Sequence, residues 1–132
     1  GFLVQETIAN GAEMILGFHR DPQLGPVILL GLGGIAAELF NDTTLRLPPL
    51  SRQDAEEMID ALKGAALLRG FRGRAKYDVN ALVSAVVAFS EMVVALGDRL
   101  LEAEINPLFV LPESQGVRAG DGVMVLREGE CS

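Results

Sequence analysis

The sequence is poor in residues that form covalent cross-links or bind transition metals. Its 132 residues include one cysteine, one histidine and no tryptophan. Cys131 alone cannot form an internal disulfide, and His19 alone cannot build a histidine-based zinc cluster. These shortages exclude a disulfide-stapled scaffold and a zinc domain made by this chain alone. The single thiol also favours a reducing, cytoplasmic location.

Positive charge and long apolar runs are also scarce. Lysine and arginine number 11 against 18 aspartates and glutamates, which gives a formal net charge of −7. A chain this acidic is a poor electrostatic partner for nucleic acid or for an anionic membrane. No unbroken apolar stretch approaches the ~18 residues of a membrane span, so no transmembrane helix is expected. A phosphate ligand would need a metal cation or backbone N–H groups to bind here.

What the sequence does contain is the composition of a folded domain, with 49% hydrophobic and 22% charged residues. It begins abruptly in strand-like sequence, which indicates a piece of a longer polypeptide. The first third reads as sequential strands with one alternating apolar face, formed by Met14, Leu16 and Phe18. Turn signals separate these strands at Asn10-Gly11, Asp21-Pro22 and Gly25-Pro26.

Two helices and a hairpin are predicted in the rest of the chain. Ser51, with Asp54 three residues later, forms a capping-box pattern at the start of the first helix. Asp78 is the N-cap of the second helix, Val79–Leu96. The strands Leu100–Leu111 and Gly116–Leu126 then form a hairpin, followed by a polar tail over 127–132. The sequence therefore predicts an α+β fold, a mainly antiparallel sheet that carries two helices.

Polar side chains cluster on the strand Leu100–Leu111. Side chains alternate along a strand, so Glu102, Glu104 and Asn106 point to one face. Carboxylate and amide oxygens are the donors that Mg²⁺ prefers, and Mg²⁺ usually takes one or two of them plus substrate phosphates. The alternative is the solvated polar face of an ordinary antiparallel sheet.

The return strand of the hairpin strengthens the metal interpretation. If Leu111 pairs with Gly116 across the loop, Asn106 lies opposite Asp121 on the same face. The hairpin alone would then bring both side chains together with Glu104. A one-residue slip in register would turn Asp121 to the other face.

Glycine-rich and basic segments are weaker signals. Gly31-x-Gly33-x-x-Ala36 matches a dinucleotide fingerprint, but the helix and the parallel strand that such a site needs are not indicated. A tight strand exit is the alternative, and Gly33 and Gly34 can still let the backbone approach a phosphate of a nucleotide. The loop with Arg69, Arg72, Arg74 and Lys76 suits either phosphate contact or plain solvation. No catalytic role is assigned to His19.

The order of these motifs resembles a known family. The segments that carry the resemblance are 13–22, 24–39, Gly70–Gly73 with Asp78, and Glu104–Leu108. Together they resemble the C-terminal half of the ATP-grasp domain in NDP-forming acyl-CoA synthetases, relatives of succinyl-CoA synthetase β subunits and ADP-forming acetyl-CoA synthetases. The resemblance assigns residues 1–126 to the C-terminal ATP-grasp subdomain.

The resemblance implies the nucleotide- and Mg²⁺-binding portion of an enzyme that interconverts acid, CoA and NTP with acyl-CoA, NDP and phosphate through a phosphohistidine. It implies Asn106 and Asp121 as ligands of Mg²⁺ bound to ATP or ADP, and Glu104 as the catalytic residue that faces the phosphohistidine. Gln5 and Glu13 map onto nucleotide-binding positions. Gln5 stands where succinyl-CoA synthetases carry Glu, which leaves the choice between ATP and GTP open.

The resemblance also implies missing parts. The lysine-bearing first half of the ATP-grasp domain, the CoA-binding domain and the phosphohistidine segment have no counterpart in this sequence. We therefore expect no complete catalytic cycle from this chain alone, and an oligomeric intact protein with a CoA-binding domain or subunit. The alternative is a non-catalytic ATP-grasp module that regulates a fused acyltransferase or scaffolds a partner subunit.

Overall fold

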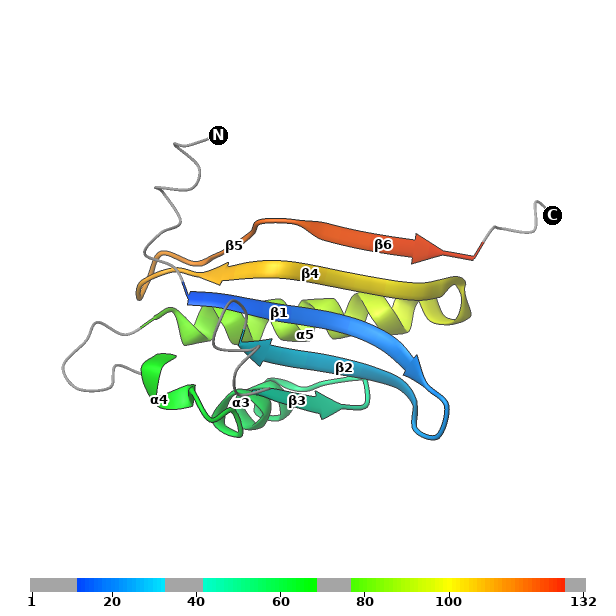
Figure 1. Ribbon diagram of the computed structural model, residues 1–132, viewed down its shortest axis with the longest axis horizontal. Coiled ribbons are helices and arrows are strands. Elements are labelled where there is room, and N and C mark those ends of the chain that lie inside the picture. The colour runs from blue at the N-terminus through cyan, green and yellow to red at the C-terminus, as the bar shows by residue number, and fades with distance from the viewer. Residues whose placement is uncertain (1–11, 33–41, 69–76, 128–132) are drawn as a thin grey trace.

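The computed structural model describes residues 12–32, 42–68 and 77–127, and an antiparallel sheet forms its frame (Figure 1). The strands run in the order β3-β2-β1-β4-β5, and β6 also pairs with β4. They are β1 (Ala12–Asp21), β2 (Gly25–Leu32), β3 (Thr43–Arg46), β4 (Leu100–Val110), β5 (Val117–Ala119) and β6 (Gly122–Leu126). All pairings between these strands are antiparallel, which confirms the α+β class. They also exclude the dinucleotide-binding interpretation, because that site needs parallel neighbours.

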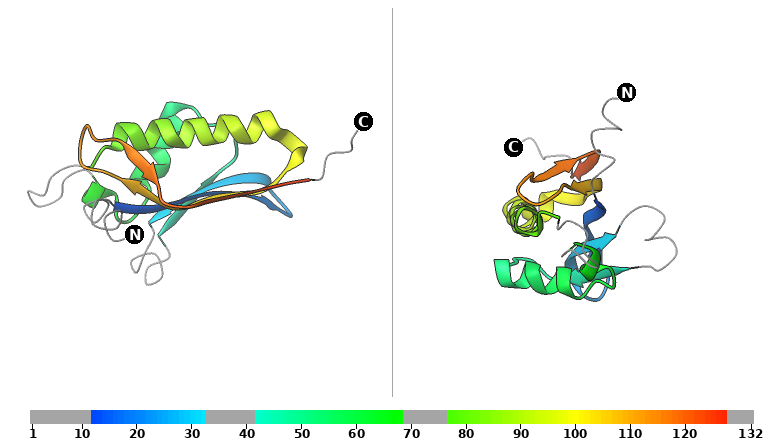
Figure 2. Two further views of the ribbon diagram at one scale, coloured as in Figure 1. Left: turned by 90° about the horizontal axis from the view of Figure 1, so that it is seen from above. Right: turned by 90° about the vertical axis from the view of Figure 1, so that its left-hand side faces the viewer.

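The two longer helices, α3 (Arg52–Asp60) and α5 (Val79–Leu96), begin where the capping residues predict. The structure adds a short helix, α4 (Ala65–Leu68), and a 3₁₀ turn, η2 (Gly97–Arg99). The Ser51 hydroxyl accepts the N–H of Asp54 at 3.1 Å, and the Asp54 carboxylate accepts the N–H of Ser51 at 2.9 Å, which is the predicted capping box. The Asp78 carboxylate accepts the N–H of Ala81 at 3.1 Å at the start of α5. Both α3 and α5 lie on the same side of the sheet (Figure 2).

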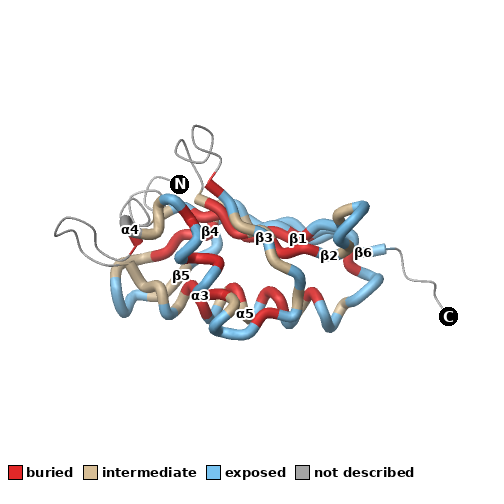
Figure 3. Tube along the Cα trace, turned by 90° about the horizontal axis from the view of Figure 1, so that it is seen from below, coloured by how far each residue is buried: buried red, intermediate tan, exposed pale blue. Residues whose placement is uncertain are grey.

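The hydrophobic core fills the space between these helices and one face of the sheet (Figure 3). Met14, Leu16 and Phe18 of β1 are buried on this face, as their alternation predicts. Apolar residues of α5 pack against the core: Leu82, Val83, Val86, Phe89 and Val93. We call the opposite face of the sheet the open face, because the helices of the described chain leave it uncovered.

The helix α5 is more apolar than the search for unbroken apolar stretches suggests. By length and composition, Val79–Arg99 is apolar enough to cross a membrane. Polar residues such as Ser90 and Glu91 interrupt the run, so a search for unbroken apolar stretches overlooks it. In this structure one side of α5 belongs to the core, which accounts for much of its apolar character.

Asp78 ties the start of α5 to the hairpin. Its second carboxylate oxygen accepts the N–H of Gly116 at 2.8 Å. Its own N–H donates to the carbonyl of Leu111 at 2.8 Å, just before the hairpin loop. The cap of α5 therefore fixes where β4 turns back into β5.

Acid is expected to weaken the cap of α3. The N–H of Ser51, and then its hydroxyl, hold the pKa of Asp54 below its usual value of 3.8. Because the folded state favours the charged carboxylate, this contribution is complete above the usual pKa and is lost as the pH falls through the lowered one. Asp54→Asn should therefore be less stable than wild type near neutral pH, with a gap that narrows in strong acid. Urea denaturation at a series of pH values measures the gap, and a constant gap contradicts the expectation.

Candidate functional site

The predicted hairpin register is the one that the structure adopts. Leu111 donates its N–H to Gly116 at 2.9 Å, and further along the hairpin Ile105 pairs with Gly122. At the position between them, Asn106 donates its N–H to the carbonyl of Asp121 at 3.1 Å. The prediction that Asn106 lies opposite Asp121 is thus confirmed. Both residues are exposed.

A change of face along β4 occurs at this point. Ala103 and Ile105 face the core before it, whereas Leu108 and Val110 face the core after it. Asn106 and Pro107, joined by a cis peptide bond, therefore occupy two successive positions away from the core. The neighbouring strand β1 has a single residue opposite them, because Leu16 pairs with Ile105 and Met14 pairs with Leu108. Asn106 therefore stays on the open face with Glu104, as alternation predicts, and the bulge turns Leu108 rather than Pro107 to the core.

Glycine is required beside this bulge. A Cβ on Gly120 would lie 2.7 Å from the Phe109 ring and 3.0 Å from Cγ of Pro107. The N–H of Gly120 donates to the carbonyl of Pro107 at 2.8 Å, which holds the two backbones together. The next residue, Asp121, accepts the N–H of Gly122 on one carboxylate oxygen at 2.8 Å. The close packing at Gly120 therefore fixes the backbone from which Asp121 projects.

Glu104 lies next to this pair on the open face. It pairs with Val123 of β6 on one side and with Gly17 of β1 on the other. Its Cγ lies 3.8 Å from the position of a Cβ built on Gly17, so the glycine leaves space beneath the Glu104 side chain. Asn106 and Asp121 are directly opposite, where Cβ atoms lie about 4.5–5.5 Å apart, and Glu104 is the diagonal neighbour of Asp121 at about 7–8 Å, so the three residues border one polar area of the open face.

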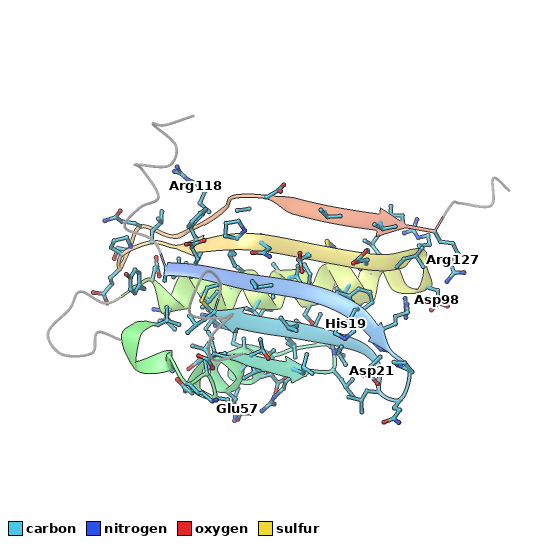
Figure 4. All side chains as sticks on the ribbon, in the orientation of Figure 1. His19, Asp21, Glu57, Asp98, Arg118 and Arg127 are labelled. Atoms are coloured by element: carbon cyan, nitrogen blue, oxygen red, sulfur yellow. The ribbon has the colours of Figure 1, made fainter. Side chains whose placement is uncertain are left out.

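Glu13 lies farther along the same face. It pairs with Phe109 of β4, and Phe109 pairs in turn with Arg118 of β5. Arg118 is exposed and extends from the sheet at the end opposite to Arg127 (Figure 4). The hairpin register alone places Arg118 opposite Phe109, and the pairing of β1 with β4 adds Glu13 to the same row. The row Glu13, Phe109 and Arg118 therefore has a negative charge at one end and a positive charge at the other.

The oxygen atoms available here suit a metal ion that is also bound by a nucleotide, rather than a metal ion held by protein ligands alone. Within the described residues, no group of three His, Cys, Asp or Glu side chains is placed to hold a metal ion. Asn106 and Asp121 offer one amide and one carboxylate on the exposed face of the sheet. Two protein oxygens fit Mg²⁺ that completes its coordination with water and phosphate oxygens. The residues present therefore fit a metal–nucleotide complex and do not fit a structural metal site.

Three of the predicted nucleotide-binding residues, Gln5, Gly33 and Gly34, lie outside the described residues, as does the basic loop. The structure shows how the two ends of the segment 33–41 are held. Leu32 donates its N–H to the carbonyl of Asp42 at 3.0 Å. The Asp42 side chain, in a residue only 4% exposed, accepts the N–H groups of Lys63 at 2.6 Å and Gly64 at 2.8 Å. No pattern in the sequence around Asp42 predicts this role.

Comparison with known proteins decides the family. Residues 1–126 match the family model of the ATP-grasp domain. The chain belongs to the ATP-grasp family. The β subunit of ADP-forming acetate–CoA ligase II from Pyrococcus furiosus is 35% identical to this ATP-grasp chain over 127 residues, which are 96% of this chain and 54% of that protein. The ADP-forming acetate–CoA ligase II of Archaeoglobus fulgidus is 38% identical over 97% of this chain and 18% of that protein.

Solved structures agree with this assignment. Dinucleotide-forming acetyl-coenzyme A synthetase 1 of Ca. Korarchaeum cryptofilum, in complex with coenzyme A and Mg-AMPPCP, superposes with a TM-score of 0.78 at 39% identity, covering 89% of this chain and 54% of that chain. A Pyrococcus horikoshii protein superposes with a TM-score of 0.83 at 36% identity, covering 89% of this chain and 49% of that chain. This ATP-grasp chain thus spans about half the length of the β subunit and of these structures.

Proposed function

We propose that this ATP-grasp chain forms the nucleotide- and Mg²⁺-binding portion of an NDP-forming acyl-CoA synthetase. The reaction converts a carboxylic acid, CoA and NTP into acyl-CoA, NDP and phosphate through a phosphohistidine. The observation that carries the proposal is the juxtaposition of Asn106 and Asp121 on the open face of an ATP-grasp sheet. The relatives support it, since several are named ADP-forming acetate–CoA ligases and one structural neighbour holds CoA and Mg-AMPPCP.

Asn106 and Asp121 are proposed to hold the magnesium ion of the nucleotide. The bulge at Asn106 and the packed Gly120 fix the two backbones from which these side chains project. When bound, Mg²⁺ neutralises phosphate charge and orients the transferred group. The acidic open face accounts for the need for a cation, because Glu104 and Asp121 would otherwise repel a polyphosphate.

The other predicted residues take roles around this pair. Glu104 is proposed to face the phosphohistidine and to position its imidazole. Gln5 and Glu13 are proposed to contact the base or ribose side of ATP or ADP, and Gly33 and Gly34 to approach the phosphates with their backbone. Arg118, in the row of Glu13, is proposed to supply a positive charge for a phosphate oxygen.

A complete cycle is proposed to need further parts. The open face has no second wall among the described residues, whereas a nucleotide in an active site is enclosed on most sides. The relatives are about twice as long as this chain or longer, which leaves room for that wall and for CoA binding. We therefore propose a cytoplasmic, oligomeric protein in which a CoA-binding domain or subunit faces this chain.

Labelling of the intact protein tests the proposed reaction. The full-length protein, with any subunit that purifies with it, is incubated with Mg²⁺ and γ-labelled ATP and analysed for acid-labile label. We expect label on the protein that is discharged by a carboxylic acid together with CoA. A folded protein that binds nucleotide or CoA and takes up no label would contradict the synthetase function and favour a regulatory ATP-grasp module.

A further inference from the structure

The outer edge of β6 has the features of a strand that pairs with another chain. Among the described strands, β6 pairs only with β4. Its apolar side chains are far from buried, with exposures of 56% for Val123, 49% for Met124, 39% for Val125 and 48% for Leu126. Sheet edges are usually protected by charged residues or proline, and Gly122–Leu126 contains neither.

The hydrogen bonds at the two ends of β6 show which backbone groups face outward. The carbonyl of Asp121 accepts from Asn106 at 3.1 Å, and the N–H of Arg127 donates to Arg99 at 2.7 Å. Both bonds point toward β4 and toward η2, which directly precedes β4. Because the bonding direction alternates along a strand, the N–H and carbonyl groups of Gly122, Met124 and Leu126 point away from β4.

We propose that the outer edge of β6 pairs antiparallel with β6 of a second copy of this chain, about a twofold axis at Met124. In this register Met124 lies opposite the partner's Met124, and Gly122 lies opposite the partner's Leu126. These are the residues whose backbone groups point outward, so each pair exchanges two hydrogen bonds. The strand is thus complementary to itself in its hydrogen bonding.

Charge complementarity at the ends of β6 supports a second copy over an unrelated strand. The segment begins after Asp121 and ends before Arg127, and all residues between them are uncharged. In the proposed register Asp121 lies opposite the partner's Arg127, so each end of the pairing joins opposite charges. Asp121 keeps oxygen lone pairs for a metal, because a carboxylate has about four acceptor sites.

The side chains also match across the proposed axis. Val123 lies opposite the partner's Val125 on the open face, where β-branched pairs stabilise a sheet. On the helix side, Met124 borders a groove of about 200 Å³ whose walls include Phe89 and Met92 of α5. The two Met124 side chains meet at the axis beside this groove, and the flexible thioether side chain adapts to such irregular surfaces.

The pairing is expected to be reversible. β6 has 5 residues, so the pairing buries less surface than the ~800 Å² per partner of a typical stable interface. We therefore expect a dimer whose fraction rises with protein concentration. If other contacts already hold this chain in a complex, the same pairing would join two such complexes through their β6 strands.

Analytical ultracentrifugation of the full-length protein, with any subunit that purifies with it, tests the association. Met124→Pro removes an outward N–H and Arg127→Glu places like charges opposite each other, so both should lower the associated fraction at least several-fold. The exposed Val94 on α5 provides the matched control, and Val94→Lys should leave association unchanged. The pair Asp121→Arg and Arg127→Glu together should restore what Arg127→Glu loses. Circular dichroism verifies the fold of each variant.

Cysteine cross-linking tests the register. In a background without exposed thiols, Met124→Cys should form a covalent dimer under mild oxidation, because directly opposite residues lie about 5.5 Å apart. Leu126→Cys is the matched control and should cross-link poorly, since it lies opposite the partner's Gly122. Concentration-independent association of the wild type, folded Met124→Pro that associates normally, or equal cross-linking at both positions would each overturn the proposal.

Discussion

Replacing Asp121 by alanine is expected to weaken binding of Mg-nucleotide by about 10- to 100-fold while leaving the fold intact. The side chain is exposed, and among the described residues it accepts a hydrogen bond from the adjacent N–H of Gly122. Its removal therefore costs the core nothing. The loss expected from deleting one charged ligand of a bound group is about 1.5–3 kcal/mol, which corresponds to this range of affinity. Isothermal titration of the intact protein with ADP in the presence of Mg²⁺ measures it.

Glu102 provides the control for this prediction. It is an exposed carboxylate of the same strand, and it pairs with Val125 of β6. Glu102→Ala removes the same charge from the face without touching Asn106 or Asp121, so its effect should stay within about threefold, the size of a screened surface charge. Asp121→Ala that binds Mg-ADP as tightly as wild type, with an unchanged circular dichroism spectrum, would reject the metal assignment. Weakened binding by both variants to the same degree would assign the effect to overall charge.

Local signals explain why the hairpin and the helices could be predicted. Asp78 and Ser51 cap helices through hydrogen bonds to residues three positions away, so the sequence window around them contains the whole interaction. The pairing of Asn106 with Asp121 follows from a short loop closed by Leu111 and Gly116. No distant part of the chain is needed to set that register.

Long-range contacts explain what sequence reasoning missed. The change of face at Asn106 depends on the bulge opposite β1, a strand from the other end of the chain. The alternation rule, applied to β4 alone, puts Ile105 and Pro107 on one face, whereas the structure turns Leu108 to the core instead. The anchoring role of Asp42 depends on where the chain turns between α3 and α4. Neither the change of face along β4 nor the anchoring by Asp42 is indicated by a sequence pattern in the residues around it.

Removing the carboxylate of Asp42 is expected to have the largest effect on stability among the polar substitutions proposed for this chain. Asp42 itself is only 4% exposed, and Asp42→Ala would leave the partly buried N–H groups of Lys63 and Gly64 without their acceptor. A fully buried unsatisfied donor costs about 1–3 kcal/mol, and water can reach these two groups in part, so we expect a total loss of roughly 1–3 kcal/mol. Chemical denaturation followed by circular dichroism gives the free energy of unfolding directly.

The size of that loss distinguishes anchoring from a general charge effect. Asp42→Asn keeps one oxygen to accept an N–H but turns an amide donor toward the other, so it should lose stability to an intermediate degree. Glu56 is an exposed carboxylate on α3, and Glu56→Ala should change the free energy of unfolding by less than about 0.5 kcal/mol. Because Asp42 also accepts the N–H of Leu32 through its carbonyl, loss of its anchor should loosen both ends of the segment that carries Gly33 and Gly34. Nucleotide affinity should therefore fall in Asp42→Ala even at temperatures where the protein stays folded, and an affinity equal to that of wild type would show that the anchor serves stability alone.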